Sequence, residues 1–258
     1  MRIHVALTPA DADPLDGQVV VVVDVLRATT TVVAACCAGC RRVIPVADSD
    51  AAVATASAFP RDEVLLAGER GGDPIAGFDL GNSPLEYTTD RAGGRTIILT
   101  TTNGTATMKI AGLARAAAAA ALVNLGAVAG WALRQRCDVT VLCSGDMGAL
   151  SLEDTVCAGL LIERMAPSAP RLELSEAARL ALRLAEYYGA RFGELRLHSR
   201  WARRLAGQGR SADLDACFRL DTTTIVPVFE AGAIVADARA LGAARVDAAS
   251  VVGREATG

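Results

Sequence analysis

The feature that most limits how this chain can fold is a run of β-branched residues, QVVVVV at Gln18–Val23. A strand without polar alternation is buried on both faces, as strands are in parallel sheets that helices cover. Asp24, the polar stretch VLRATTT and an apolar helical stretch through Cys40 follow the run. The segment therefore predicts one strand–loop–helix unit of an α/β fold.

Two further segments have the same design. The strand-like residues Thr96–Leu99 precede the loop TTTNGT and a helical run from Ala106 to Leu122, and Asp138–Cys143 precede the loop SGDMGALSLEDT and a helical run to Met165. Alternating buried strands and helices predict a layered α/β/α architecture with a largely parallel or mixed sheet. The likeness of the three segments is compatible with internal duplication.

The rest of the chain contains no recognisable division. Ser175–Arg204 predicts helix, and Leu220–Phe229 (LDTTTIVPVF) predicts a strand ended by its proline. A chain of 258 residues is long enough for one large domain or two small ones. Because no Gly/Ser linker or charge block interrupts it, we expect residues 1–258 to form a single unit, or two intertwined α/β subdomains whose boundary the sequence does not place.

Composition narrows the range of partners. The chain is 52% hydrophobic and 21% charged, with a net charge of −3 and no Lys/Arg run, which argues against nucleic-acid binding. The N-terminal residues turn acidic before an apolar signal region develops, and the apolar run Ala116–Leu133 is too weakly hydrophobic to span a bilayer. We therefore expect a cytoplasmic protein with no membrane contact.

Cysteine and histidine carry little functional signal. An odd total of seven cysteines fits reduced thiols better than a disulfide framework. Cys36, Cys37 and Cys40 suggest zinc, but no second cysteine pair or nearby histidine completes a site, so buried small side chains are the preferred interpretation. His4 and His198 lie far from every motif, which disfavours a Ser–His hydrolase.

The loops that follow the three strands are where a ligand is expected. Ligands of open α/β sheets bind beyond the carboxyl ends of the strands, where helix N-termini present free N–H groups suited to anions. Arg27 adds a bidentate fork, and hydroxyl and amide residues add donors. The residues of these loops expected to bind substrate are Thr29, Thr30, Thr102, Asn103, Gly104 and Thr105.

The same loops carry carboxylates, namely Asp24, Asp146, Glu153 and Asp154. An anion site lined with carboxylates makes chemical sense when a divalent cation lies between them. Mg²⁺ favours carboxylates, retained water and substrate phosphate oxygens over a closed protein cage. The residues therefore predict a Mg²⁺-assisted phosphate site.

Each of these motifs also has a purely structural interpretation. Ser151–Asp154 and Ser83–Glu86 fit helix capping, the second with Pro84 at the first helical position. Asp24 is compatible with a simple turn after a strand, and so is Asn103–Gly104. The repetition of polar clusters after three apolar strands favours the functional interpretation.

A glycine- and proline-rich loop, GERGGDPIAGFDLGNSP at Gly68–Pro84, supplies further charges. Its glycines allow close approach of backbone to a ligand. We expect the loop to form another wall of the site through Glu69, Arg70 and Asp79, with Asn82 and Ser83 contacting substrate.

Four motifs in order resemble the 2-phosphosulfolactate phosphatase family: DVLRATTT (Asp24–Thr31), GERGGDPIAGFDLGNSPLEY (Gly68–Tyr87), TTNGT (Thr101–Thr105) and CSGDMGALSLEDTVCAG (Cys143–Gly159). The resemblance implies a Mg²⁺-dependent enzyme that hydrolyses 2-phosphosulfolactate to 3-sulfolactate and phosphate, a step that serves coenzyme M biosynthesis in methanogens. It also implies a homodimer. The chain departs from the family at Asp146 and Met147, where a small or hydroxyl residue is common.

The motifs and the resemblance together suggest roles for individual residues. Arg27 and Arg70 are the expected anion clamps, and Asp24 is the preferred nucleophile or general base, with the choice between the two left open. Two alternatives remain: a Mg²⁺-dependent phosphatase for another phosphorylated 2-hydroxy acid, or a non-catalytic anion- or nucleotide-binding protein. The residues expected to ligate Mg²⁺, directly or through water, are Asp24, Glu69, Asp79, Glu153 and Asp154.

Overall fold

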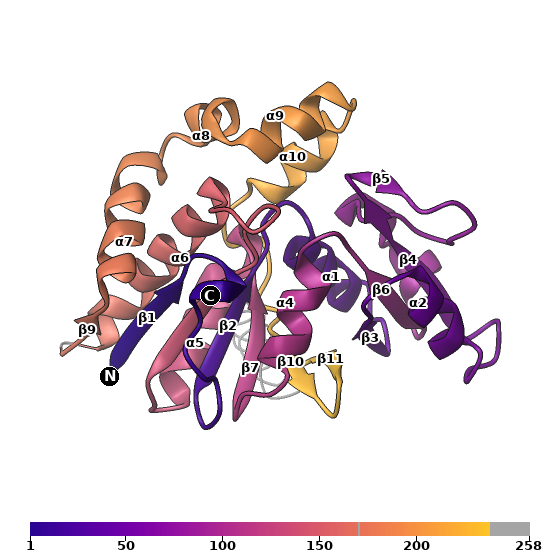
Figure 1. Cartoon of the computed structure of the whole chain (residues 1–258), viewed down its shortest axis with the longest axis horizontal. Coiled ribbons are helices and arrows are strands. Elements are labelled where there is room, and N and C mark those ends of the chain that lie inside the picture. Colours follow the sequence, from indigo (N-terminus) through magenta and orange to yellow (C-terminus); the bar gives the residue numbers. More distant parts are fainter. Residues whose placement is uncertain (170, 238–258) are drawn as a thin grey trace, which may run out of the picture.

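The computed structural model describes residues 1–169 and 171–237 of the 258-residue chain. It has an α/β fold built on a large mixed sheet, as the sequence predicts (Figure 1). The strands of the described part are β1 (Arg2–Ala6), β2 (Val19–Val23), β3 (Arg42–Pro45), β4 (Val64–Arg70), β5 (Asp73–Pro74), β6 (Thr96–Thr100), β7 (Ala116–Ala120), β8 (Val139–Cys143), β9 (Glu173–Leu174), β10 (Pro227–Glu230) and β11 (Ala233–Ala236).

Helices connect most of the strands. The α-helices of the described part are α1 (Ala28–Cys37), α2 (Ser49–Ala56), α3 (Thr89–Ala92), α4 (Gly104–Ala111), α5 (Leu125–Arg134), α6 (Leu152–Met165), α7 (Glu176–Tyr188), α8 (Phe192–His198), α9 (Arg200–Gly207) and α10 (Ser211–Cys217). Short 3-10 helices are η1 (Pro9–Asp11), η2 (Pro84–Glu86), η3 (Leu122–Asn124) and η4 (Ala166–Ser168).

The sheet consists of two parallel parts joined by an antiparallel hairpin. Its strand order is β5-β4-β6-β3-β11-β10-β7-β2-β8-β1-β9. Strands β4, β6 and β3 run parallel to one another, and so do β7, β2, β8, β1 and β9. The hairpin β10–β11 pairs antiparallel with β7 on one side and with β3 on the other. Strands from distant parts of the chain therefore share one sheet, and the division into one or two units stays a prediction.

Helices cover both faces of each parallel part. Val19, Val21 and Val23 of β2 pack with α5, α6 and α7, whereas Val20 and Val22 point to the opposite face. On that opposite face, α1 and α4 pack against β2 and also against β3, β4 and β6, so these two helices lie between the two parts of the sheet (Figure 1). Helix α2 covers the outer face of β4 and β6. The predicted α/β/α layering is thus present twice, with α1 and α4 shared.

One predicted helix is wrong in part. The run from Ala106 to Leu122 forms helix only over α4, and its five alanines Ala116–Ala120 form strand β7. Alanine has the highest helix propensity, but β7 is hydrogen-bonded to β2 through the register Val19↔Ala116 to Val23↔Ala120 and has β10 on its other side. Tertiary pairing overrides local propensity here, and the small side chains let helices lie close to both faces.

The predicted strand at Leu220–Phe229 is also shifted. The proline does not end this strand but begins it, because β10 starts at Pro227. Proline fits the first residue of a strand, where its missing N–H breaks no ladder hydrogen bond. The other predicted segments are confirmed: strands at β2, β6 and β8, helices at α1 and α6, and three consecutive helices α7 to α9 across Ser175–Arg204.

The described residues contain neither a helix that could span a membrane nor a ready-made group of metal ligands. Across residues 1–169 and 171–237, no helix has both the length and the apolar composition needed to cross a bilayer. All seven cysteines are free thiols, and the described residues hold no group of three His, Cys, Asp or Glu side chains arranged for a metal ion. Of the cysteine run, Cys36 is buried and Cys40 packs partly buried against the core, as the preferred interpretation expects, but Cys37 is exposed.

The closest helix contact in the core provides a test of the fold. A Cβ atom added at Gly159 of α6 would lie 2.1 Å from the backbone oxygen of Ala181 in α7, so Gly159→Ala forces the two helices apart. We expect this variant to lower the free energy of unfolding by at least about 2 kcal/mol, the usual scale for an overpacked core.

Gly130→Ala in α5 is the matched control, because its added Cβ meets only the flexible guanidinium of Arg134, at 3.4 Å. This control should gain up to about 1 kcal/mol from helix propensity. Urea unfolding of both variants measures the difference. Equal stabilities would contradict the close α6–α7 contact.

Candidate active site

The polar loops after the parallel strands converge, as predicted for an α/β sheet. Asp24 follows β2, and Gly104 begins α4 after β6; a Cβ at Gly104 would lie 2.6 Å from Asp24 Oδ2. The Asp154 carboxylate in the first turn of α6 accepts a hydrogen bond from the Val25 N–H, 2.8 Å long. The N-termini of α1, α4 and α6 therefore meet around Asp24.

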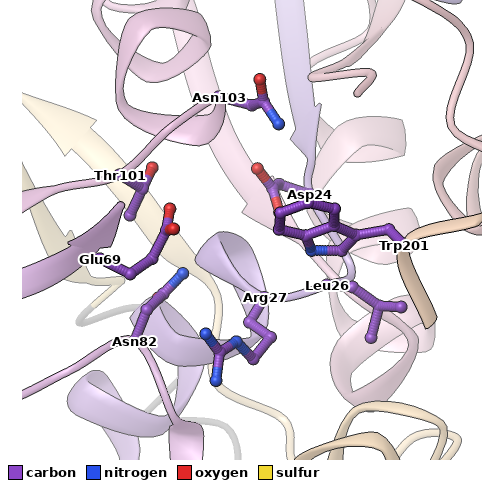
Figure 2. Close-up of a pocket in the computed structure, with 8 residues that line it drawn as sticks. All are labelled: Asp24, Leu26, Arg27, Glu69, Asn82, Thr101, Asn103 and Trp201. Atoms are coloured by element: carbon purple, nitrogen blue, oxygen red, sulfur yellow. The ribbon is translucent and has the colours of Figure 1, made fainter. Parts of the chain in front are cut away.

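A small polar cavity lies at this meeting point (Figure 2). Its volume is about 10 Å³, roughly the space that one water molecule needs. The lining residues are Asp24, Leu26, Arg27, Glu69, Asn82, Thr101, Asn103 and Trp201.

Asp24 is the central carboxylate of the site. Its Oδ1 accepts a hydrogen bond from the Ala28 N–H, 3.0 Å long, so the side chain occupies the first turn of α1. Burial raises the pKa of Asp24 to about 7; the Ala28 hydrogen bond opposes the rise, and the negative charge of Glu69 adds to it. A carboxylate with such a pKa is suited to exchanging a proton near neutral pH.

Glu69 lies across the cavity from Asp24 and is held rigidly. Its Oε1 accepts from the Thr102 N–H at 2.7 Å, and its Oε2 accepts from the Gly72 N–H at 2.7 Å and from the Thr102 hydroxyl at 3.0 Å. These bonds connect the end of β4, the β4–β5 turn and the loop after β6. The glycine-rich loop thus reaches the cavity through Glu69, whose role there stays a prediction.

Glu153 and Asp154 lie on the other side of Asp24, in the first turn of α6. Ser151 caps this helix by accepting from the Asp154 N–H, so the structural interpretation of that motif is also correct. Burial raises the pKa of both carboxyls, and the negative charge of Asp24 adds to the rise at Asp154. Asp24, Glu69, Glu153 and Asp154 are called the acidic cluster below.

Arg27 and Asn82 form the polar wall opposite Asp24 and Asn103 (Figure 2). The guanidinium of Arg27 is buried, forms an ion pair with Asp213 and donates from Nη2 to the Gly72 carbonyl at 2.8 Å. Asn82 is 4% exposed, and its Oδ1 has no hydrogen-bond partner among the residues that the structure describes. A buried acceptor without a donor indicates a position where a ligand or water supplies one.

Two charged residues of the glycine-rich loop lie outside the cavity lining. Arg70 is exposed and donates to the Glu69 carbonyl and the Thr100 hydroxyl. Asp79 accepts from Arg61 Nη2 at 2.5 Å and from the Leu66 N–H at 2.8 Å. Although burial alone raises the pKa of Asp79, these bonds lower it overall. Asp79 is thus separate from the acidic cluster.

The predicted hydroxyl ligands mostly stabilise the loops themselves. Thr29 and Thr30 donate to the carbonyls of Asp24 and Val25, both at 2.8 Å. Thr105 donates to the Thr101 carbonyl at 3.2 Å. These three residues lie beside the cavity without lining it, and their contact with substrate stays a prediction.

The remaining predicted contacts are distributed around the same loops. Asn103 lines the cavity, and its Oδ1 accepts from the Met147 N–H at 3.3 Å. Thr102 bonds to Glu69, and Gly104 abuts Asp24. The predicted cap at Ser83 is wrong, because its hydroxyl accepts no hydrogen bond from the backbone N–H groups of η2 and instead donates to Asp213 at 2.5 Å; Pro84 does begin that turn.

Asp146, where the chain departs from the resembled family, has a specific partner. Arg200 of α9 donates from Nε to Asp146 Oδ2 at 2.8 Å. Met147 is 73% exposed and adopts a φ of 52°, which is rare for a non-glycine residue. Asp146 therefore links the loop after β8 to α9.

Sequence reasoning missed the residues contributed by the C-terminal helices. Trp201 of α9 lines the cavity, and Asp213 of α10 pairs with Arg27. Helices α8 to α10 extend along one end of the molecule from α7 toward β5 (Figure 1). Neither residue belongs to one of the four motifs, so no local pattern pointed to them.

Comparison with known proteins identifies relatives for most of the chain. Residues 6–232 match the sequence profile of the family described as 2-phosphosulpholactate phosphatase. A probable 2-phosphosulfolactate phosphatase of Symbiobacterium thermophilum is 41% identical, over 87% of this chain and 96% of the relative. Proteins with the same name from Gloeobacter violaceus and Deinococcus radiodurans are each 38% identical, over 88% and 90% of this chain and 94% and 95% of the relative.

The raised pKa of Asp24 predicts how stability depends on pH. The pKa of Asp24 is about 7 in the folded protein and 3.8 in the unfolded chain, so folding takes up a proton between these pH values. The stability that this carboxyl contributes is therefore fully present below pH 4 and is lost as the pH rises through 7. Asp24→Asn stays neutral and keeps the Oδ1 acceptor for Ala28. We therefore expect the variant to gain thermal stability relative to wild type between pH 5 and pH 8.

Thermal unfolding followed by circular dichroism in EDTA at both pH values measures this gain. The readout is how much the difference in melting temperature between Asp24→Asn and wild type changes from pH 5 to pH 8, so any pH-independent effect of the substitution cancels. A difference that is the same at pH 5 and pH 8 would show that Asp24 is not held at a raised pKa.

Proposed function

This chain belongs to the 2-phosphosulfolactate phosphatase family, and we propose that it is a Mg²⁺-dependent phosphoric monoester hydrolase that converts 2-phosphosulfolactate to 3-sulfolactate and phosphate. The family match over residues 6–232 is the observation that carries the activity. The match covers 94% to 96% of the length of these relatives, which supports proposing their named activity for this chain.

The cavity has the side chains that this reaction needs. The substrate carries a phosphate, a carboxylate and a sulfonate, or about four negative charges. Arg27 presents a fixed guanidinium for one of these groups, and the α4 N-terminus at Gly104 adds backbone dipoles beside Asp24. The unpartnered Asn82 Oδ1 is an acceptor for a water or a protonated oxygen.

Asp24 is our choice for the residue that initiates hydrolysis. It follows the fully buried β2 and lines the cavity, and a bound cation beside it would favour the ionised carboxylate that either role requires. As a general base, it takes the proton from a water that attacks phosphorus as the ester P–O bond breaks. As a nucleophile, its carboxylate attacks phosphorus while the ester P–O bond breaks and the 3-sulfolactate oxygen leaves with a proton from solvent; water then hydrolyses the aspartyl phosphate to free phosphate and the carboxylate.

The acidic cluster supports the proposed need for Mg²⁺. The four buried carboxyls do not form a ready-made cage of three ligands, but their oxygens and the Asn82 amide oxygen are the kind of donor that Mg²⁺ prefers, and the ion needs only one or two carboxylates when it retains waters. We assign Asp24 as its main ligand, with Glu69 and Glu153 reached directly or through water. When bound, the ion would neutralise phosphoryl oxygens and lower the pKa of an attacking water.

The assembly and location of the enzyme are further parts of the proposal. Resemblance to the family supports a homodimer, which light scattering of the purified protein tests. The sequence supports a cytoplasmic enzyme that acts on a small anionic phosphate ester without nucleic-acid or membrane partners.

Phosphate release from racemic 2-phosphosulfolactate tests the activity directly. We expect turnover with Mg²⁺, its loss in EDTA, and its recovery when Mg²⁺ is restored. Asp24→Asn should lower kcat by at least about 10²-fold, the scale of one acid–base group.

Asp48→Asn is the matched control, because it makes the same chemical change at the exposed cap of α2, where asparagine caps equally well. This control should retain wild-type kcat. Full turnover in EDTA would contradict the role of the metal. A loss of kcat below tenfold in Asp24→Asn would show that Asp24 is only a turn residue.

A substrate panel tests the sulfonate. A site that holds the sulfonate by hydrogen bonds discriminates strongly against analogues that leave its polar groups unpaired. We expect kcat/KM for phospholactate and phosphoglycolate to be at least about 100-fold below that for phosphosulfolactate.

Other outcomes of the panel identify the alternatives. Equal or higher kcat/KM without the sulfonate would indicate a phosphatase for another phosphorylated 2-hydroxy acid. Thermal stabilisation by these anions without any phosphate release would indicate a non-catalytic binding protein.

A further inference from the structure

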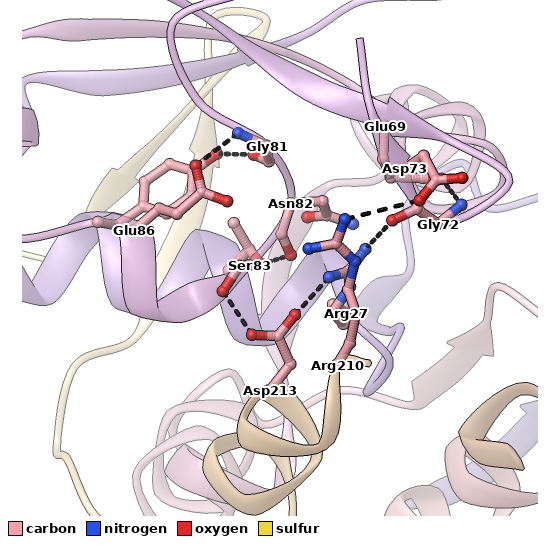
Figure 3. A network of polar contacts seen from close by, with 12 residues as sticks. Arg27, Glu69, Gly72, Asp73, Gly81, Asn82, Ser83, Glu86, Arg210 and Asp213 are labelled. Carbon is pink, nitrogen blue, oxygen red and sulfur yellow. Dashed lines mark hydrogen bonds and ion pairs between the residues drawn. The ribbon is translucent and has the colours of Figure 1, made fainter. Parts of the chain in front are cut away.

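Arg27 of the cavity wall forms an ion pair with Asp213, a residue 186 positions later in the chain (Figure 3). The side chains are only 2% and 7% exposed. Asp213 lies in α10 and is absent from the cavity lining, so it reaches the site only through its partners.

Stability alone is a weak reason for such a pair. Removing two charges from water costs about as much as their attraction returns, and well-packed apolar residues often do better. The pair does determine where the guanidinium points. Because Arg27 Nη2 also donates to the Gly72 carbonyl, the guanidinium is held from two directions.

Asp213 also holds a second wall of the cavity. Its Oδ1 accepts from the Ser83 hydroxyl at 2.5 Å, and the neighbouring Asn82 lines the cavity. The Thr31 hydroxyl donates to the Asn82 carbonyl at 2.9 Å, which fixes the same peptide from the side of α1. One carboxylate thus sets the position of both Arg27 and the Asn82–Ser83 segment.

The helix that carries Asp213 is itself attached to the site. Arg210 approaches Asp73 at 3.6 Å, and Gln208 donates to the Gly71 carbonyl at 3.1 Å. The Gly72 N–H in the same turn donates to Glu69 (Figure 3). The start of α10 and the β4–β5 turn therefore form one connected frame around Arg27.

We infer that Asp213 is a positioning residue for the reaction: it orients the Arg27 guanidinium toward the phosphate ester and holds the Asn82–Ser83 wall in register with it. The inference rests on the proposed function, in which Arg27 binds an anionic group of the substrate. Asp213 itself does not touch the substrate.

Asp213→Asn is the most informative variant, because an amide of the same shape accepts from Arg27 and donates to Ser83 while the charge is lost. We expect kcat for phosphosulfolactate to fall at least about tenfold, the scale of one charged hydrogen bond, while KM changes less than threefold. Asp215→Asn is the control: Asp215 lies on the same helix and pairs with Arg196, but its side chain is 65% exposed, so we expect wild-type kinetics.

A double-mutant cycle separates positioning from a general structural role. If Asp213 acts through Arg27, then Asp213→Asn should cause little further loss in an Arg27→Gln background. Losses that multiply in the double variant would overturn the inference. If Asp213→Asn does not fold, Asp213→Glu replaces it in the same cycle, because it keeps the charge and displaces it by one methylene.

The outcomes also distinguish this inference from the proposed function. An active wild type in which Asp213→Asn behaves like Asp215→Asn would overturn the inference alone. A wild type that releases no phosphate from any ester of the panel would overturn the proposed function and, with it, the role assigned to Asp213.

Discussion

The parallel pairing of β2 with β7 and β8 is the constraint on which the site depends. The three strands pair in one register, with Val23 beside Ala120 and Cys143, so their carboxyl ends lie level at one edge of the sheet. Helices on both faces exclude water from this edge. Asp24 follows the central strand, so the same packing that buries the valines also buries the carboxylate and raises its pKa.

The acidic cluster serves the site at a cost in the free energy of folding. Four buried carboxyls repel one another when ionised, and the hydrogen bonds from Ala28, Val25, Thr102 and Gly72 offset only part of that cost. Such an arrangement fits a site whose ligands bring positive charge, as the proposed Mg²⁺ does. The rigid backbone donors also keep the carboxylates in position without substrate, which limits reorganisation during the reaction.

Much of the fold and part of the site are predictable from local sequence. The valine run and the two further apolar strands correctly predict the α/β fold. The structure brings Asp24, Arg27 and Asn103 to one cavity from the loops after those strands, and Glu69 and Asn82 from the glycine-rich loop. Asp79 shows the limit, because a carboxylate in the same loop as Glu69 pairs with Arg61 instead. Which way a loop carboxylate points depends on neighbours that sequence spacing does not specify.

The sequence by itself determined the residues that end the three predicted strands β2, β6 and β8, because the apolar runs and the polar residues that follow them are local properties of the pattern. Only the tertiary structure decided that Ala116–Ala120 forms a strand, that the hairpin β10–β11 joins the two parallel parts, and that Trp201 and Asp213 complete the site. These outcomes depend on pairing and packing between segments about 100 or more residues apart. No local pattern encodes such contacts, since their free energy appears only when both partners are in place.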